Sequence, residues 1–174
     1  MTAASTSVHA SAVLVGTRAV LIRGPSGAGK SRLAFDLILA GRAGQLPPAV
    51  LIGDDRVHLE ARGGQLVVGG APELAGLIEI RGLGIRRCEF VEEAIAGLVV
   101  DLGAVDGERL PPPQALLADI SGVKLPRIPV GAGYAALPLV IAALSMTESS
   151  CSTRHPADCS KGFGNHMRPS IATE

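Results

Sequence analysis

The sequence predicts a single α/β domain, with a twisted mixed sheet and flanking helices. Two observations lead to this fold class. Short β-branched runs separated by glycines alternate with longer apolar runs of helical spacing. Hydrophobic residues make up 47% of the 174 residues and aromatic residues only 2%, so the core must consist of Ala, Val, Leu and Ile. A chain of this length can bury one compact core.

The expected elements follow the chain in a simple order. Strands are expected at residues 8–15 and 19–23 as a hairpin, then a helix at 30–43. Further strands are expected at 49–53, 57–61, 65–68, 77–80, 98–102 and 125–130, a loop at 104–113, a helical turn within 113–120 and a last helix at 135–144. Residues 1–145 are therefore expected to form the folded domain. Residues 146–174 are polar and aperiodic, which predicts a disordered tail.

The charge balance and the cysteines exclude several classes of protein. Sixteen basic and sixteen acidic residues cancel, so no overall field favours nucleic acid or an anionic membrane. No stretch reaches the roughly 18 apolar residues of a membrane span. Cys88, Cys151 and Cys159 fit no disulfide framework or metal spacing. We expect a cytoplasmic protein without nucleic-acid or membrane partners.

The strongest motif is a glycine-rich loop that fits the pattern G-x-x-x-x-G-K-[ST] in full. It consists of Gly24, Pro25, Ser26, Gly27, Ala28, Gly29, Lys30 and Ser31. Backbone N–H groups of such a loop and the start of the next helix bind phosphate oxygens. Lys30 is expected to neutralise the ATP phosphates and Ser31 to ligate Mg²⁺. An ordinary strand-to-helix turn is the alternative, and the complete match disfavours it.

Two acidic segments are candidates for the rest of the chemistry. Asp54 and Asp55 follow an apolar run, and one of them could accept a proton while its neighbour supports a metal or is held by Arg56. A turn with solvated acids is the alternative. Asp101, at the end of another apolar run, competes as the acidic strand end usual in P-loop enzymes, but it lies far beyond Asp54 in the chain.

Glu79 and Arg81 flank Ile80 and are followed by two glycines. A carboxylate there offers oxygen to Mg²⁺, and a guanidinium offers a planar fork to phosphate. Taken alone, the segment could equally be an edge strand that ends in a turn.

Together these pieces resemble the catalytic, C-terminal domain of HPr kinase/phosphorylase. The resemblance covers residues 9–144 and rests on His9, the GPSGAGKS loop, GDDRV at 53–57 and EIRGLGI at 79–85. It implies a P-loop kinase domain of the HPr kinase and phosphoenolpyruvate carboxykinase type. It also implies ATP- and Mg²⁺-dependent transfer to a serine of an HPr-like phosphocarrier protein of a bacterial phosphotransferase system, and a homo-oligomer.

The resemblance assigns roles by motif position. It gives phosphate binding to Lys30 and Mg²⁺ binding to Ser31 and Glu79. The remaining catalytic positions are the base within the pair Asp54 and Asp55, its supporting histidine His9, and a later arginine, Arg109. Arg81 joins the nucleotide-binding residues.

Two departures from the family pattern modify these expectations. The N-terminal domain of longer members has no counterpart, as in the short form known from proteobacteria. Residues 124–133 replace the family's late segment without its Gly-Arg-Asn, which predicts weak reverse phosphorolysis. A nucleotide-sensing regulator and a small-molecule kinase are the alternative functions.

Overall fold

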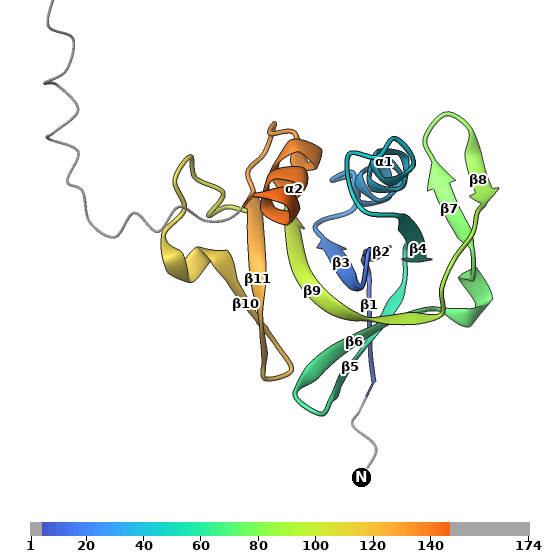
Figure 1. Ribbon diagram of the computed structural model, residues 1–174, viewed down its shortest axis with the longest axis horizontal. Helices are drawn as coiled ribbons and strands as arrows, with labels where there is room; N and C mark the ends of the chain where they lie inside the picture. Colours follow the sequence, from blue (N-terminus) through green and yellow to red (C-terminus); the bar gives the residue numbers. More distant parts are fainter. Residues whose placement is uncertain (1–4, 147–174) are drawn as a thin grey trace, which may run out of the picture.

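The computed structural model describes residues 5–146 and confirms an α/β fold with a mixed sheet and flanking helices (Figure 1). The nine strands of the main sheet are β1 (Thr6–Val8), β2 (Ser11–Val15), β3 (Arg18–Arg23), β4 (Ala49–Gly53), β5 (Val57–Arg62), β6 (Gln65–Gly70), β9 (Glu93–Leu102), β10 (Leu117–Ile120) and β11 (Val123–Val130). The two helices are α1 (Lys30–Arg42) and α2 (Ala136–Ser145). A separate hairpin consists of β7 (Leu77–Ile80) and β8 (Gly84–Arg87), and short 3₁₀ turns are η1 (Pro72–Leu74) and η2 (Pro113–Leu116).

The main sheet is organised around β9, its longest strand. The strand order is β1-β5-β6-β9-β3-β2-β4, and β11 and β10 continue from β9 along a second branch. β9 pairs antiparallel with β6 through its first residues and parallel with β3 and β11 through its last ones. The ends of β3 and β9 therefore lie next to each other, and the glycine loop begins there.

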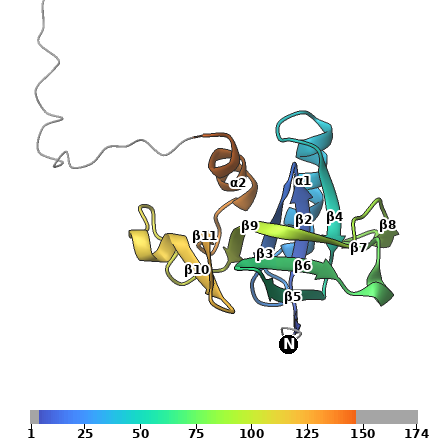
Figure 2. The ribbon, with the colours of Figure 1, turned by 60° about the horizontal axis from the view of Figure 1, so that its bottom comes forward.

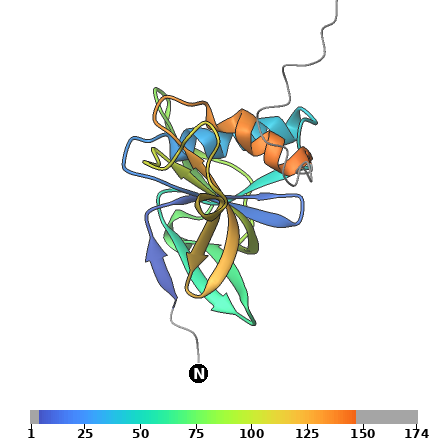
Figure 3. The same cartoon turned by 90° about the vertical axis from the view of Figure 1, so that its left-hand side faces the viewer.

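The alternating side chains of the sheet form two cores. Val20 and Ile22 of β3 face α1 and α2, while Leu21 faces the opposite side. The helices cover the first face, where they lie side by side (Figure 3). The second core is enclosed by the sheet itself, because β5–β6 and β10–β11 curl around it. The β7–β8 and β10–β11 hairpins stand at opposite ends of the molecule (Figure 2).

Most predicted elements are confirmed, but the strand expected at residues 8–15 and the helical turn expected at 113–120 need correction. The single strand expected at residues 8–15 is two strands, because the chain changes partners at His9 and Ala10, from β5 to β3 and β4. Only residues 113–116 of the expected helical turn are helical. Residues 117–120 are β10, which pairs with β11 through a tight turn at Ser121 and Gly122, where both φ angles are positive.

Three smaller findings complete the comparison. β9 begins at Glu93, five residues before the strand expected at 98–102. Between residues 5 and 146 no helix is both long and apolar enough to cross a membrane. The expected disordered tail lies almost wholly outside the described residues, which end at Met146.

Helix α1 offers a matched test of the packing. Leu37 is fully buried in the core between helix and sheet, whereas Leu39 is 43% exposed. We expect Leu37→Ala to lower the free energy of unfolding by about 2–5 kcal/mol, because it removes buried contacts and leaves a cavity. Leu39→Ala should cost less than about 1 kcal/mol. Urea denaturation followed by circular dichroism measures both, and equal losses would contradict the assigned burial.

Candidate active site

The glycine loop connects the end of β3 to the start of α1. Gly29 caps the helix in a left-handed conformation, with φ 97°, and Lys30 is the first helical residue. Gly24 has φ 147°, and a Cβ there would lie 2.8 Å from the carbonyl oxygen of Leu102. The loop therefore packs against the end of β9, and a side chain at position 24 would push it away.

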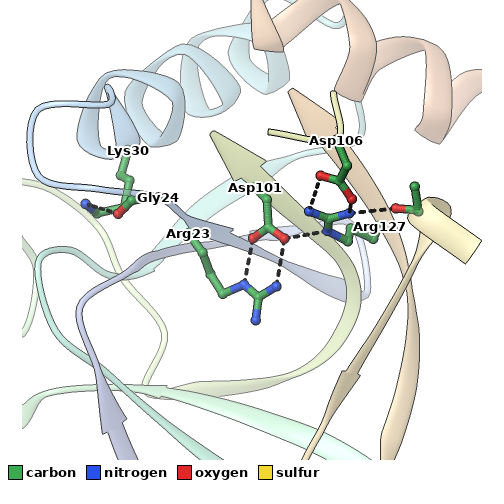
Figure 4. Close-up of polar contacts among 7 residues, drawn as sticks. Arg23, Gly24, Lys30, Asp101, Asp106 and Arg127 are labelled. Atoms are coloured by element: carbon green, nitrogen blue, oxygen red, sulfur yellow. Dashed lines mark hydrogen bonds and ion pairs between the residues drawn. The ribbon is translucent and has the colours of Figure 1, made fainter. Parts of the chain in front are cut away.

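Lys30 is buried, with only 5% of its surface exposed. Its Nζ donates a hydrogen bond of 3.0 Å to the carbonyl oxygen of Gly24 (Figure 4). It donates a second one of 3.2 Å to the carbonyl oxygen of Pro25. The ammonium group thus lies against the loop backbone. A cation in that place, together with the first N–H groups of α1, makes the loop suitable for a phosphate group.

The carboxylate of Asp54 connects three elements of the site. It is 4% exposed and accepts hydrogen bonds from the hydroxyls of Ser11 (2.5 Å) and Ser31 (2.9 Å) and from the backbone N–H of Glu79 (3.1 Å). These donors belong to β2, α1 and β7. Charge-assisted hydrogen bonds of this kind are stronger than neutral ones, so Asp54 fixes the three elements relative to one another.

Asp55 points elsewhere because the backbone turns sharply between the two acids. Asp55 has φ 65°, and the N–H of Arg56 donates to the carbonyl oxygen of Asp54 at 2.8 Å, which closes a three-residue turn. The Asp55 side chain is 70% exposed, and its Oδ1 lies 3.2 Å from His9 Nε2. The two neighbouring carboxylates therefore have separate environments and separate partners.

The strand register explains why His9 and Ser11 meet the two acids. Val8 of β1 pairs with Val57 of β5, two residues after Asp55, so His9 lies beside Asp55. Ala12 of β2 pairs with Gly53 of β4, next to Asp54, and the register then shifts by one residue. Such a bulge redirects side chains at the end of a strand. Ser11 had no place among the sequence candidates, although it is a polar residue within an apolar run.

Two alternatives raised by the sequence are wrong. Arg56 does not hold the acidic pair, because its Nη1 bonds Glu73 at 3.4 Å on the surface. Asp101 is not available as an acidic strand end, because two arginines occupy both of its oxygens.

Those arginines belong to an ion-pair network behind the loop (Figure 4). Arg23 donates two hydrogen bonds of 2.7 Å to Asp101, and Arg127 donates one of 2.5 Å. Arg127 also forms a bidentate pair with Asp106 (2.6 and 3.0 Å) and donates to the carbonyl oxygen of Ala115 at 2.8 Å. The network therefore joins β3, β9 and β11 to the loop at 103–112.

The network lowers the pKa values of its carboxyl groups. Burial acts to raise the pKa of Asp101, but the combined hydrogen bonds and charges of Arg23 and Arg127 outweigh it, so this pKa lies below its ordinary value. The hydrogen bond from Arg127 is the main cause that lowers the pKa of Asp106. Both acids are therefore ionised at neutral pH.

The oxygen atoms around Asp54 are suitable ligands for a magnesium ion that is also bound to phosphate. Ser31 Oγ contacts Asp54, and the backbone of Glu79 does the same, so a hydroxyl and two acidic residues are grouped beside the loop. The residues in 5–146 contain no group of three or more His, Cys, Asp or Glu side chains suited to hold a metal by themselves. Mg²⁺ usually binds through one or two carboxylates, water and substrate phosphates.

Two predicted residues are not brought into contact with the others. Arg81 lies in the exposed turn between β7 and β8, and Arg109 lies exposed in the loop at 103–112. Within residues 5–146 neither side chain forms a hydrogen bond or an ion pair. The structure thus groups His9 with Asp55, and Lys30 with its loop, and Asp54 with Ser31 and the backbone of Glu79.

A strand, a glycine loop, a buried lysine and a helix define a P-loop domain. More specifically, the chain belongs to the HPr Serine kinase C-terminal domain family, whose model matches residues 1–94. This match confirms the family resemblance that the sequence motifs indicated.

Curated relatives support the same family. The chain is 40% identical over 145 residues to the HPr kinase/phosphorylase of Enterococcus faecalis, covering 75% of this chain and 44% of that protein. It is 45% identical over 80 residues to the HPr kinase/phosphorylase of Limosilactobacillus reuteri, covering 45% of this chain and 23% of that protein. The chain spans less than half the length of these relatives.

A solved structure shows the same fold. The Hpr(Ser) kinase/phosphatase from Coxiella burnetii superposes with a TM-score of 0.63 at 27% sequence identity. The match covers 80% of this chain and 93% of that chain. The P-loop kinase fold of the HPr kinase type is therefore confirmed.

The ion-pair network generates a pH-dependent prediction. Folding lowers the pKa of Asp101, so its carboxylate stabilises the folded protein at pH values above the ordinary pKa of 3.8. This stabilisation is lost as the pH falls through the lower pKa that Asp101 has in the folded protein. At pH 7 we expect Asp101→Asn to cost about 3 kcal/mol of unfolding free energy, since both arginines lose a charged partner. Urea denaturation of both proteins should show this difference shrinking below about pH 4.

The matched control is Asp119→Asn, an exposed aspartate outside the network whose Oδ1 accepts a hydrogen bond from the N–H of Gly122 at 3.0 Å, a bond that an asparagine oxygen can also accept. Its cost should stay near zero at every pH. A difference for Asp101→Asn that does not change with pH would contradict the assigned charge.

Proposed function

We propose that the chain is an ATP- and Mg²⁺-dependent serine kinase that phosphorylates an HPr-like phosphocarrier protein of a bacterial phosphotransferase system. The observation that carries the proposal is the position of Asp54. Its carboxylate accepts hydrogen bonds from the P-loop serine Ser31 and from the backbone of Glu79. The next residue, Asp55, is exposed and contacts His9. A phosphate site, a metal site and a candidate base thus follow one another along a short stretch of the molecule.

In this proposal the loop from Gly24 to Ser31 binds the triphosphate. Backbone N–H groups contact its oxygens, and the Lys30 ammonium moves from the loop carbonyls to the phosphate charge. Ser31 and Glu79 would hold Mg²⁺, and Asp54 orients the Ser31 hydroxyl. The bound Mg²⁺ supplies neutralisation of phosphate charge during transfer.

Asp55 is the better candidate for the base. Its carboxylate is exposed, so an incoming serine hydroxyl can approach it, and His9 holds its orientation. Asp54 is buried and already accepts three hydrogen bonds, which suits a positioning role. In this proposal Asp55 takes the proton of the acceptor serine as the serine oxygen bonds to the γ-phosphorus, and the bond from that phosphorus to ADP breaks.

Arg81 and Arg109 are proposed to approach the phosphates when substrate is bound. Both are exposed and lack carboxylate partners among the described residues, so no ion pair has to break first. A cation that reaches the transferring group stabilises the charge that develops there.

The forward direction is proposed to dominate. Arg127 is the only arginine within residues 124–133, and its guanidinium is bound to Asp101 and Asp106. It is therefore not available to bind inorganic phosphate, which supports weak phosphorolysis. A cytoplasmic location, expected from the cysteine pattern and the apolar stretches of the sequence, and a homo-oligomer, expected from the family resemblance, complete the proposal.

The base assignment can be tested by a kinase assay. Wild-type protein with ATP, Mg²⁺ and a purified HPr-like protein should label a serine of that protein. Asp55→Asn should lower the rate about 10³-fold, since general-base catalysis contributes on this scale. Asparagine tolerates the left-handed backbone, so the fold and nucleotide affinity should persist. Asp119→Asn should retain wild-type activity. Full activity of Asp55→Asn would reject the assignment.

The acceptor can be tested with the same assay. Transfer to a low-molecular-weight alcohol without any protein acceptor would favour the small-molecule kinase. Nucleotide binding without transfer under any magnesium condition would favour the nucleotide-sensing regulator. Either result would overturn the proposed protein kinase.

The nucleotide site has its own test. Lys30→Ala should weaken Mg·ATP binding at least about 100-fold in isothermal titration calorimetry, because a charge-assisted contact to phosphate is lost within the loop. Lys124→Ala, at an exposed lysine on β11, is the matched control and should bind as the wild type does. Equal affinities for the two variants would place the nucleotide elsewhere.

A further inference from the structure

An open groove of about 1000 Å³ lies between α1 and the β7–β8 hairpin. Its floor is apolar and is formed by Phe35 and Ile38 of α1 and by Ile78 and Ile80 of β7. Figure 1 shows the hairpin standing beside α1 and apart from the main sheet. The groove is separate from the phosphate loop and is not used by the proposed kinase reaction.

Three arginines line this groove. Arg42 comes from the last turn of α1, and Arg86 and Arg87 come from β8. Arg86 pairs with Ile78 across the hairpin, so both side chains lie on the face that α1 covers. Glu89 is the single acidic residue of the lining, and the groove is therefore positively charged.

These arginines have no carboxylate partner, as is also true of Arg18, Arg81 and Arg109 among the described residues, whereas five other arginines do. Arg23, Arg32, Arg56, Arg62 and Arg127 each pair with a carboxylate. Between residues 5 and 146 no carboxylate oxygen lies within 4.0 Å of the guanidinium nitrogens of the three groove arginines. Their charge is thus not balanced inside the protein, and an acidic occupant would balance it.

The hairpin also leaves apolar surface uncovered beside these charges. Leu83 is 59% exposed and Phe90 is 43% exposed, and both line the groove. All four residues of β8 are exposed, and a two-stranded hairpin has little stability of its own in water. Apolar surface rimmed by charge is typical of a protein-binding site.

We propose that the groove binds an acidic amphipathic segment of a partner protein. Apolar side chains of that segment would cover Phe90 and the isoleucine floor, while its carboxylates would pair with Arg42, Arg86 and Arg87. The arginines come from two separate elements, α1 and β8, so several carboxylates spaced along a chain fit them better than one small anion does.

This docking has a consequence for the proposed active site. The floor residues Ile78 and Ile80 flank Glu79, whose backbone N–H bonds Asp54. A segment bound in the groove therefore stabilises the strand that carries Glu79. The inference goes beyond the proposed kinase activity, because binding to the groove can be measured without any phosphate transfer.

Two synthetic peptides provide the probe. Both carry leucines at helical spacing and a fluorescein label, and their remaining positions are mainly Glu in one and mainly Lys in the other. Fluorescence anisotropy with the full chain should show the Glu peptide bound at least about tenfold more tightly than the Lys peptide. Combining Arg86→Glu with Arg87→Glu should weaken binding of the Glu peptide at least about tenfold.

Arg18→Glu is the matched control, because Arg18 is exposed on β3 and lies outside the groove. It should leave the affinity unchanged. If circular dichroism shows that the double glutamate variant is unfolded, the variant with Arg86→Ala and Arg87→Ala takes its place, with the same expected direction.

Three results would overturn the proposal. Equal affinity for the two peptides would show that charge does not select the occupant, and unchanged affinity of the folded double variant would place the peptide elsewhere. A double variant that changes the molar mass in light scattering while it binds peptide normally would assign the groove to a second copy of this chain.

Discussion

The carboxylate of Asp54 is the contact on which the geometry of the candidate site depends. It is buried, yet two hydroxyls and one backbone N–H donate to it, so its charge is compensated without a cation. Each donor comes from a different element of secondary structure. The Asp54 side chain therefore holds Ser31 and Glu79 at a defined distance from each other. Because Asp55 is the next residue in the chain, its position relative to them is also defined.

The parts of the fold that depend on local sequence were predictable. The glycine loop and α1 follow from consecutive residues, since a left-handed Gly29 and the first helical Lys30 need no distant partner. The break between β1 and β2 was not predictable, because it arises when β1 pairs with β5, a strand far along the chain, and no residue near His9 indicates this change of partner. The strand β10 has a local partner instead, since β11 follows it directly through the turn at Ser121 and Gly122, and the expectation of a helical turn missed this hairpin.

The same distinction applies to the site. The motifs named residues that the fold groups around Lys30, Asp54 and Asp55, but Arg81 and Arg109 lie apart from them, and the sequence left the choice between Asp54 and Asp55 as the base open. A three-residue turn and the distant Ser11 give the two acids different surroundings, and neither is visible in the local pattern. Arg127 is a similar case, because only the folded chain shows that Asp101 and Asp106 occupy its guanidinium.

The central position of β9 has a consequence for the order of folding. The loop-bearing strand β3 ends at Arg23, but its parallel partner is completed only at Leu102, nearly half the chain later. Closing so long a segment costs chain entropy before any contact compensates it. During synthesis, the glycine loop therefore cannot reach its folded position until β9 has left the ribosome. A chain that ends before β9 would contain the glycine loop without the strand against which it packs.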